Sequence, residues 1–235
     1  MSITFAERDE LQGFLDSTFQ DRAGLRILEV GCGSRSNVRL GKDPYVVGLD
    51  LSRDQLDRNH ELREKIQGDI QTIELPPASF DVAICWDVIE HLRFPRQALD
   101  RIFSCLRDGG LAILAGPNLY SVKGMTARLT PFRFHLWFYR RVAGWDRSAD
   151  TTMGRFPTYL RHSSSLPAVL CYLEHNGHRV LFRRLYEHPV QKAWRRKRRW
   201  LDVVLKGLAG AASLATLKRA DWLLSDYIVV AQKNG

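Results

Sequence analysis

The chain has 235 residues, 45% of them hydrophobic, which is enough for one α/β domain with a sizeable core. It has no apolar stretch of about 18 residues, and residues 1–8 lack a basic segment followed by an apolar one. A membrane span and a signal peptide are therefore not expected. The four cysteines form no CxxC pair, which argues against a zinc site or a disulfide framework and favours a reducing compartment.

Charge is divided unevenly along the chain. Residues 1–118 hold 14 Lys or Arg and 19 Asp or Glu, a net charge of −5, whereas residues 119–235 hold 21 and 7, a net charge of +14. This asymmetry points to an anionic partner of the second part, such as a membrane surface, a phosphorylated substrate or nucleic acid. A solvated basic face with no dedicated partner is the alternative.

The first half predicts alternating helices and strands. In chain order these are a helix at 5–20, strands at 26–30 and 45–50, a helix after Ser52 running through Leu56 and His60, a strand at 80–86, a helix at 94–106 that stops at the turn 108–110, and a strand at 111–115. This order predicts a largely parallel sheet covered on both faces. Such sheets bind ligands beyond the carboxyl ends of their strands, where the glycine loop, Asp50, Trp86 and Pro117 lie.

The pattern changes after Asn118. Residues 119–165 are rich in aromatic residues and arginine and have a weaker periodicity. A helix is predicted at 166–175, a strand at 178–186, a helix at 201–217 and a final strand at 222–231.

The loop Glu29–Gly33, after the first strand, is the first candidate for a cofactor site. Gly31 and Gly33 let the backbone approach a ligand, and their N–H groups could meet a carboxylate. Asp50 ends the second strand, where a carboxylate can accept hydrogen bonds from both hydroxyls of a ribose. A dinucleotide site uses similar parts, but its GxGxxG fingerprint requires glycine at the position of Ser36, which disfavours a nicotinamide cofactor.

Five segments resemble the motifs of class I S-adenosylmethionine (SAM)-dependent methyltransferases. They are Ile27–Gly33, Val47–Ser52, Gly68–Ile70 with Leu75–Asp81, Cys85–Leu92, and Leu106–Leu111. Their order and spacing over residues 25–118 resemble the subgroup that includes the ubiquinone-biosynthesis O-methyltransferases and many tailoring enzymes. Arg35 is a departure, since many members have a third glycine there. The resemblance implies a Rossmann-like seven-stranded sheet with helices on both faces and helical substrate-covering insertions.

SAM is accordingly the expected cofactor. Glu29 could hold its ammonium group and Asp69 its adenine amine, with Leu51 and Ile70 against the ring faces. Trp86 either lies beside the cofactor or is a core aromatic. The candidate cofactor-binding residues are Glu29, Gly31, Gly33, Asp50, Leu51, Asp69, Ile70 and Trp86.

Methyl transfer is an in-line displacement, in which alignment supplies much of the acceleration. An oxygen or nitrogen nucleophile can also need a general base. His91 is the first candidate, because it follows the fourth-strand segment; the alternative is that it caps or packs the next helix. His135 and His162 are further candidates, and no metal is expected in the site.

We predict one methyltransferase domain over 1–235. Its parts are a SAM-binding core at 22–118, an aromatic and basic insertion at 119–165 that covers the substrate, and a last part at 166–235 with a basic insertion at 190–220. The acceptor is expected to be an O or N atom of a small or lipid-linked metabolite, such as a glycan, a quinone or a natural-product intermediate. A catalytically silent SAM-fold protein, a membrane-associated scaffold or a nucleic-acid methyltransferase is the alternative.

The run Trp194–Trp200 encloses five consecutive basic residues and leads into the leucine-patterned helix. This combination resembles interfacial membrane anchors, so an anionic membrane surface is a candidate partner of residues 194–217. Nucleic acid would use the same arginines, but no RNA-binding module is recognisable, and a solvated helix is the simplest alternative. The expected location is cytoplasmic, or peripheral at the inner membrane face; the sequence does not define an oligomeric state.

Overall fold

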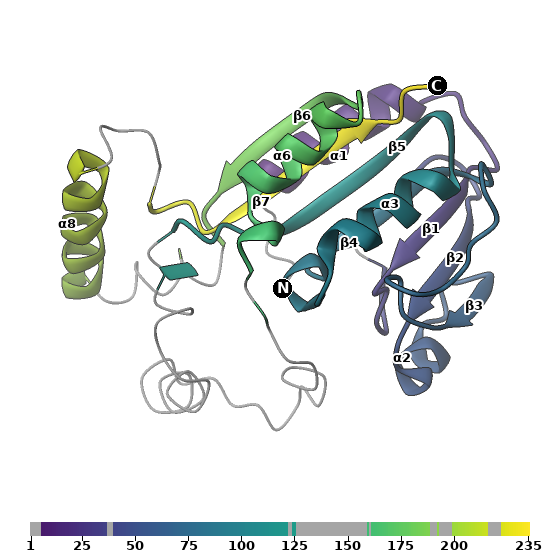
Figure 1. Ribbon diagram of the computed structural model, residues 1–235, viewed down its shortest axis with the longest axis horizontal. Coiled ribbons are helices and arrows are strands. Elements are labelled where there is room, and N and C mark those ends of the chain that lie inside the picture. Colours follow the sequence, from purple (N-terminus) through teal and green to yellow (C-terminus); the bar gives the residue numbers. More distant parts are fainter. Residues whose placement is uncertain are drawn as a thin grey trace.

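A seven-stranded sheet forms the centre of the molecule (Figure 1). The computed structural model describes residues 6–36, 40–121, 124–125, 159, 161–188, 192, 199–215 and 222–235. The strands are β1 (Arg26–Val30), β2 (Tyr45–Asp50), β3 (Glu64–Gln67), β4 (Phe80–Trp86), β5 (Leu106–Pro117), β6 (Arg179–Tyr186) and β7 (Asp226–Gln232), in the order β3-β2-β1-β4-β5-β7-β6. Strand β7 is antiparallel to both of its neighbours, whereas the pairs among β1 to β5 are parallel.

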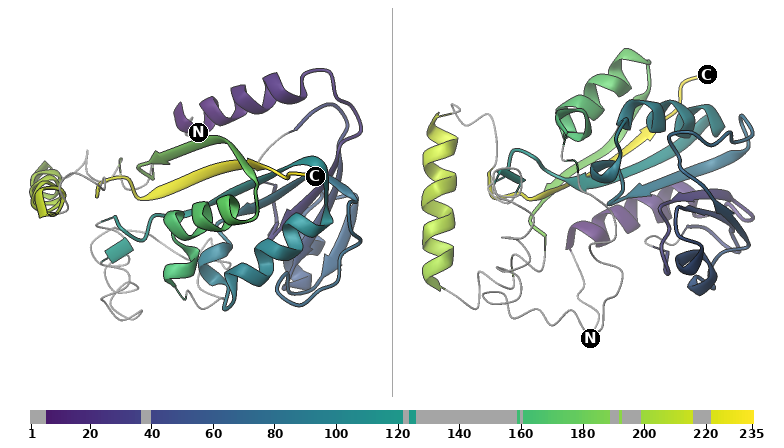
Figure 2. Two further views of the ribbon diagram at one scale, coloured as in Figure 1. Left: turned by 45° about the horizontal axis from the view of Figure 1, so that its top comes forward. Right: turned by 60° about the horizontal axis from the view of Figure 1, so that its bottom comes forward.

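Helices cover both faces of this sheet. The helices within the described residues are α1 (Ala6–Phe19), α2 (Arg53–Arg58), α3 (Pro95–Cys105), α6 (Leu166–His175) and α8 (Arg199–Ala215), with 3₁₀ turns η1 (Ile89–His91) and η3 (His162–Ser164). Helix α1 lies on one face, and α3 and α6 lie on the other (Figures 1 and 2). Helix α8 stands apart from the sheet, beyond the end where β5 finishes and β7 begins. None of the described helices is long and apolar enough to cross a membrane.

The core consists of two layers, one on each side of the sheet. On the α1 side, Leu11 and Leu15 pack with residues of β1, β4, β5 and β7. On the other side, Ile102 of α3 and Leu173 of α6 pack against the opposite faces of the same strands. Because the strands are buried on both faces, they read as continuous apolar runs in the sequence. The predicted Rossmann-like α/β fold is confirmed.

Most element boundaries match the sequence predictions, but four details were wrong. Strand β5 begins at Leu106, and the predicted turn at 108–110 is an irregularity within this strand: Leu106 pairs with Phe80 and Leu111 with Val82, while Gly109 has a φ of +75°. Helix α2 ends at Arg58, short of His60, and the Ser52 side chain makes no capping hydrogen bond. Strand β3, which is polar, was not predicted. Strand β7 begins at Asp226 rather than at 222.

Candidate functional site

Parallel pairing brings the ends of three strands to one edge of the sheet. Val30 pairs with Leu49 on one side and Cys85 on the other. The residues that follow these strands, from Gly31, Leu51 and Asp87 onward, therefore meet at the carboxyl edge, where open α/β sheets bind ligands.

The turn after β1 needs glycine at two positions for different reasons. Gly31 has a φ of +65°, and a Cβ there would lie 2.3 Å from Cγ2 of Val88. Gly33 has a φ of +55°, but a Cβ there would have only Oε1 of Gln55 within 4 Å, at 3.9 Å. Glycine at position 31 thus lets the loop pack against Val88, the residue before η1. Glycine at position 33 leaves open space beside the backbone, which a ligand could occupy.

Both glycine N–H groups donate within the protein. The Gly31 N–H donates to the Leu49 carbonyl at 2.7 Å, and the Gly33 N–H donates to Oδ2 of Asp50 at 3.0 Å. Both N–H groups thus already have an acceptor within the protein, and their contact with a ligand carboxylate stays a prediction. Their contribution is the shape of the turn and the position of Asp50.

The Asp50 carboxylate is held from two sides. Oδ2 accepts from Gly33, and Oδ1 accepts from the Ser52 N–H at 2.8 Å, while the side chain is largely buried. Each carboxylate oxygen can accept more than one hydrogen bond. The group is thus fixed in orientation and still able to accept from two neighbouring hydroxyls.

Glu29 is the most deeply buried acid of the site, at 1% exposure. Its Oε2 accepts from Oγ of Ser36 at 2.5 Å. Ser36 stands where a dinucleotide fingerprint would have glycine, and its role as a partner of Glu29 was missed at the sequence level. Between the two acids, burial raises the pKa of Cys32 to about 12, with Asp50 and then Glu29 adding to the rise, so this thiol stays protonated at neutral pH.

The buried side-chain amide of Asn59 also stabilises the glycine turn after β1. Asn59, which is fully buried, donates from Nδ2 to the Gly33 carbonyl at 3.3 Å and accepts from the Glu61 N–H at 3.1 Å. It lies just after α2, where nothing in the residue pattern distinguishes it from a solvated loop asparagine. Sequence reasoning missed it for that reason.

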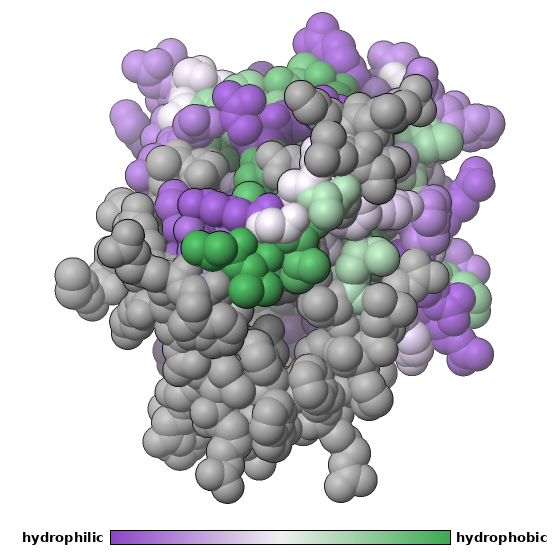
Figure 3. All heavy atoms as spheres, turned by 90° about the vertical axis from the view of Figure 1, so that its left-hand side faces the viewer, coloured by the Kyte–Doolittle hydropathy of each residue, from purple (hydrophilic) through white to green (hydrophobic). Residues whose placement is uncertain are grey.

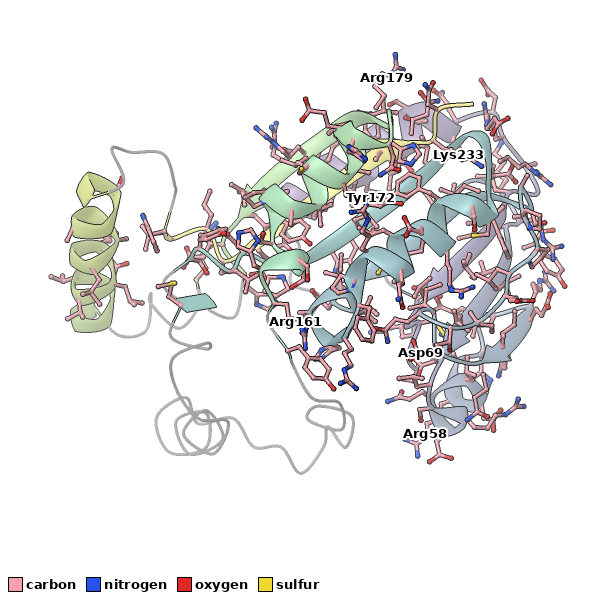
Figure 4. The ribbon with its side chains drawn as sticks, viewed as in Figure 1. Arg58, Asp69, Arg161, Tyr172, Arg179 and Lys233 are labelled. Carbon is pink, nitrogen blue, oxygen red and sulfur yellow. The ribbon has the colours of Figure 1, made fainter. Side chains whose placement is uncertain are left out.

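Asp69 is partly buried and is oriented by Gln71. Its Oδ1 accepts from the Gln71 N–H at 2.8 Å, and both of its oxygens lie 3.0 Å from Nε2 of Gln71. Oε1 of Gln71 in turn accepts from the Phe94 N–H at 2.7 Å, which links this loop to the start of α3. In Figure 4, Asp69 lies toward α2, and Arg161 lies near η3.

The two apolar candidates for the adenine site differ in exposure. Leu51 is 52% exposed at the end of β2, whereas Ile70 is 4% exposed and belongs to the core. Leu51 is available to a ring, and Ile70 instead supports the loop from within. Trp86, at the end of β4, is partly buried and packs against the core on the α1 side.

The predicted histidines lie at different places. His91 ends η1, with Nε2 3.9 Å from Oε1 of Glu90 and a third of its side chain exposed. His162 begins η3, is exposed, and has its ring 6.1 Å from the Tyr120 ring. His135 lies outside the described residues.

A buried tyrosine lies beside the end of β5. The Tyr227 hydroxyl donates to the Ser164 carbonyl at 3.2 Å, which ties β7 to η3. A Cβ on Gly116 would lie 3.5 Å from this hydroxyl and 3.5 Å from Oε2 of Glu90, so these groups surround the same glycine. Burial, followed by the charge of Glu90, raises the pKa of Tyr227. The sequence showed Tyr227 only as part of an apolar strand.

A parallel sheet with a glycine turn after β1 and a fixed acid at the end of β2 defines the cofactor edge of a Rossmann-like nucleotide-binding fold. The family model described as "Methyltransferase domain" matches residues 5–168. The chain belongs to this methyltransferase domain family. At the level of this domain, the predicted resemblance, the enzyme class (a SAM-dependent methyltransferase) and the cofactor are confirmed.

Curated relatives match about half of the chain. A ubiquinone biosynthesis O-methyltransferase of Xanthomonas euvesicatoria is 33% identical over 112 residues, which are 43% of this chain and 47% of the relative. One of Paraburkholderia phymatum is 31% identical over 150 residues, 54% of this chain and 64% of the relative. The match thus spans less than two thirds of either relative.

Solved structures share the fold over nearly the whole chain. A SAM-dependent methyltransferase from Mesorhizobium loti aligns with a TM-score of 0.50 and 18% identity, covering 94% of this chain and 96% of that one. Phosphoethanolamine N-methyltransferase 2 of Haemonchus contortus, in complex with SAM, aligns with a TM-score of 0.56 and 17% identity, covering 96% and 53%. At these identities the likeness concerns the fold alone.

Proposed function

We propose that this protein transfers a methyl group from SAM to an oxygen or nitrogen atom of a small or lipid-linked molecule. The observation that supports this most is the Asp50 carboxylate, which Gly33 and Ser52 hold in one orientation beside an open glycine turn. A fixed carboxylate that can accept from two hydroxyls suits the ribose of SAM.

The other candidate residues would recognise the remaining parts of SAM. Glu29 is a buried acid that would accept from the ammonium group, and Leu51 offers an exposed apolar surface to the adenine. Asp69, oriented by Gln71, would accept from the adenine amine. Gly31 and Gly33 shape the loop, Ile70 supports it, and Trp86 would border the methyl end.

SAM supplies, when bound, a methyl group on a sulfonium leaving group, so the protein has mainly to align the acceptor and exclude water. His91 remains the candidate base, since it lies at the carboxyl edge, with its Nε2 3.9 Å from Oε1 of Glu90. A proton taken from the acceptor would reside on this imidazole.

The partner and the location follow from charge. Because residues 119–235 carry the excess of basic residues, we propose an anionic or lipid-linked acceptor and a position peripheral at the inner face of a membrane. The cytoplasmic side is proposed because the four cysteines form no CxxC pair, which favours a reducing compartment. A catalytically silent protein of the same fold is the rival. A silent protein would show no measurable affinity for SAM or no methyl acceptor. A nucleic-acid methyltransferase is a further alternative, and it would bind RNA or DNA through the basic residues.

Calorimetry with SAM and with S-adenosylhomocysteine tests the cofactor site. We expect the wild-type protein to bind both and Asp50→Asn to bind at least about tenfold more weakly, because a hydrogen bond to a charged group contributes about 1.5–3 kcal/mol. Asp54→Asn is the matched control, since this acid is exposed on α2 four residues later. It should bind SAM as the wild type does.

The result that would reject the proposal is a well-folded wild-type protein that binds neither compound. Equal affinity in Asp50→Asn and Asp54→Asn would reject the assignment of Asp50 alone. A methyl-transfer screen with labelled SAM, against lipid-extracted and water-soluble metabolites in parallel, then separates the acceptor classes.

A further inference from the structure

Helix α8 has an unusual distribution of polarity. Its partly buried or buried described residues, Asp202, Leu205, Ala209 and Ser213, recur at helical spacing and form one stripe. The exposed residues lie on the opposite side. Three of these are large apolar residues: Val203 at 70% exposure, Leu208 at 55% and Val204 at 48%.

The exposed side of α8 is nearly uncharged. Its other exposed described residues are Gly207, Gly210 and Ala211, together with Lys206, which pairs with Asp202 at 2.7 Å along the edge of the helix. We call Val203, Val204, Gly207, Leu208, Gly210 and Ala211 the apolar face of α8. Figure 3 looks onto the side of the molecule where α8 lies and shows hydrophobic side chains gathered at its centre. A surface helix normally turns its apolar side inward, whereas α8 exposes apolar side chains on its outer side as well.

The sequence places positive charge immediately before this face. Residues 195–199 are five consecutive Arg or Lys, and Lys192 before them is exposed. An apolar helix side next to a basic cluster matches the chemistry of an anionic phospholipid surface, whose headgroups attract the cations while its acyl boundary accepts the apolar side chains.

The positive charge also favours a phospholipid surface over two other partners of the apolar face, a second copy of the chain and nucleic acid. A second copy of the chain could cover the apolar face, but it would add a second run of five positive charges rather than an anionic partner. Nucleic acid would satisfy the basic residues through its phosphates but would leave the apolar face without a partner. A lipid surface satisfies both features at once.

The position of α8 links this surface to the sheet. The helix lies beyond the end where β5 finishes, in the views of Figures 1 and 2. Since β5 runs parallel to β4, and β4 to β1, this is the edge that holds the glycine turn and Asp50.

We propose that the apolar face of α8 inserts into the interface of an anionic phospholipid membrane and holds the carboxyl edge of the sheet next to it. This docking does not depend on catalysis, so it can stand or fall separately from the proposed function.

Sedimentation of the full chain with vesicles tests the proposal. We expect binding to phosphatidylcholine vesicles containing phosphatidylglycerol, little binding to phosphatidylcholine alone, and a loss of binding as salt is raised. The double variant Val203→Gln/Leu208→Gln should bind about tenfold more weakly, because it removes two apolar side chains that would enter the membrane interface and leaves the net charge unchanged. Val180→Gln, at an exposed valine of β6, is the matched control and should bind as the wild type does.

A second variant measures the electrostatic part. Neutralising Arg195, Arg196, Arg198 and Arg199 to Gln should weaken binding about a hundredfold or more, at about 1 kcal/mol for each basic residue near the surface. Calorimetry with SAM on every variant, together with circular dichroism, verifies that the fold is intact. If the protein binds vesicles but not SAM, the docking proposal stands and the proposed function is rejected. If it binds SAM but not vesicles, the proposed function stands and the docking proposal is rejected.

Three results would overturn the docking proposal. One is the absence of binding to anionic vesicles. Another is binding that the Val203→Gln/Leu208→Gln variant leaves unchanged, since the basic run would then act without the helix. The third is a concentration-dependent dimer that the double variant dissociates, which would make the apolar face a contact between two copies of the chain.

Discussion

The two ends of the sheet's carboxyl edge are built differently. At the β1–β2 end, backbone geometry and buried hydrogen bonds fix each acid in place: Asp50 has two N–H donors, and Glu29 has Ser36. At the β5–β7 end, hydrogen bonds join strands to loops, while α8 stands away from the sheet with apolar side chains exposed. The first arrangement suits a ligand of fixed shape, and the second suits contact with a surface.

The largest expected effect tests whether backbone shape decides the β1–β2 end. Gly31→Ala should lower the free energy of unfolding by about 3 kcal/mol or more, because it combines a left-handed φ with a Cβ that overlaps Val88. Chemical denaturation measures this. Gly13→Ala is the control, since Gly13 lies in α1 with no heavy atom near a Cβ, and it should raise stability by about 0.5–1 kcal/mol. Equal effects of the two changes would contradict the role given to Gly31.

The next largest effect is on the pH dependence of stability, and it contrasts the buried thiol of Cys85 with the exposed thiol of Cys171. Burial raises the pKa of Cys85 from 9.0 to about 12, so above pH 9 the unfolded chain releases this proton before the folded one does. Stability should therefore fall as pH rises, by about 1.4 kcal/mol per pH unit from this group, or about 3 kcal/mol by pH 11.

Unfolding curves at pH 8 to 11 verify that slope. Cys85→Ala should remove this part of the slope, whereas Cys171→Ala should leave the slope unchanged, since the Cys171 side chain is exposed. The same slope in both variants would mean that Cys85 loses its proton as readily in the folded protein as in the unfolded one.

The smallest effect concerns the β5–β7 end. Tyr227→Phe removes the donor to the Ser164 carbonyl and should lower the free energy of unfolding by about 1–2 kcal/mol. Tyr45→Phe should change it by less than about 0.5 kcal/mol, because Tyr45 is exposed and its hydroxyl lies 3.5 Å from Glu64. If thermal unfolding shifts equally in both, the tie between β7 and η3 contributes little.

Local residue patterns were enough to predict much of this fold. Strands β1, β2 and β4 have the predicted bounds, because strands buried on both faces produce continuous apolar runs that end abruptly at glycine or an acid. Strand β3 was missed because Glu64–Gln67 lacks a continuous apolar run. It lies at the edge of the sheet, is only partly buried, and pairs with β2 alone.

The candidate site was predicted in its residue types more than in its contacts. Asp50 lies at the predicted strand end, but the pairing of Gly33 with Asp50 and of Ser36 with Glu29 depends on how the loop closes, which residue spacing does not define. The role of Tyr227 depends on a partner 63 residues away in the chain. Contacts of this range come from tertiary packing, and no local pattern specifies them.

The reversed strand β7 has a consequence for how this protein can diversify. Because β6 and β7 are antiparallel neighbours and Tyr186 pairs with Asp226, the two strand ends where α8 is inserted already lie side by side. A short hairpin turn could join them in place of the whole intervening segment. Leu224 and Ser225 accept hydrogen bonds from Asn118, after β5, whereas the pairing among β1 to β5 involves no residue between β6 and β7. We therefore expect that the part of the segment before Leu224 can be shortened or replaced while β1 to β5 keep their pairing. A lineage could in this way change where the protein works and leave its cofactor chemistry as it is.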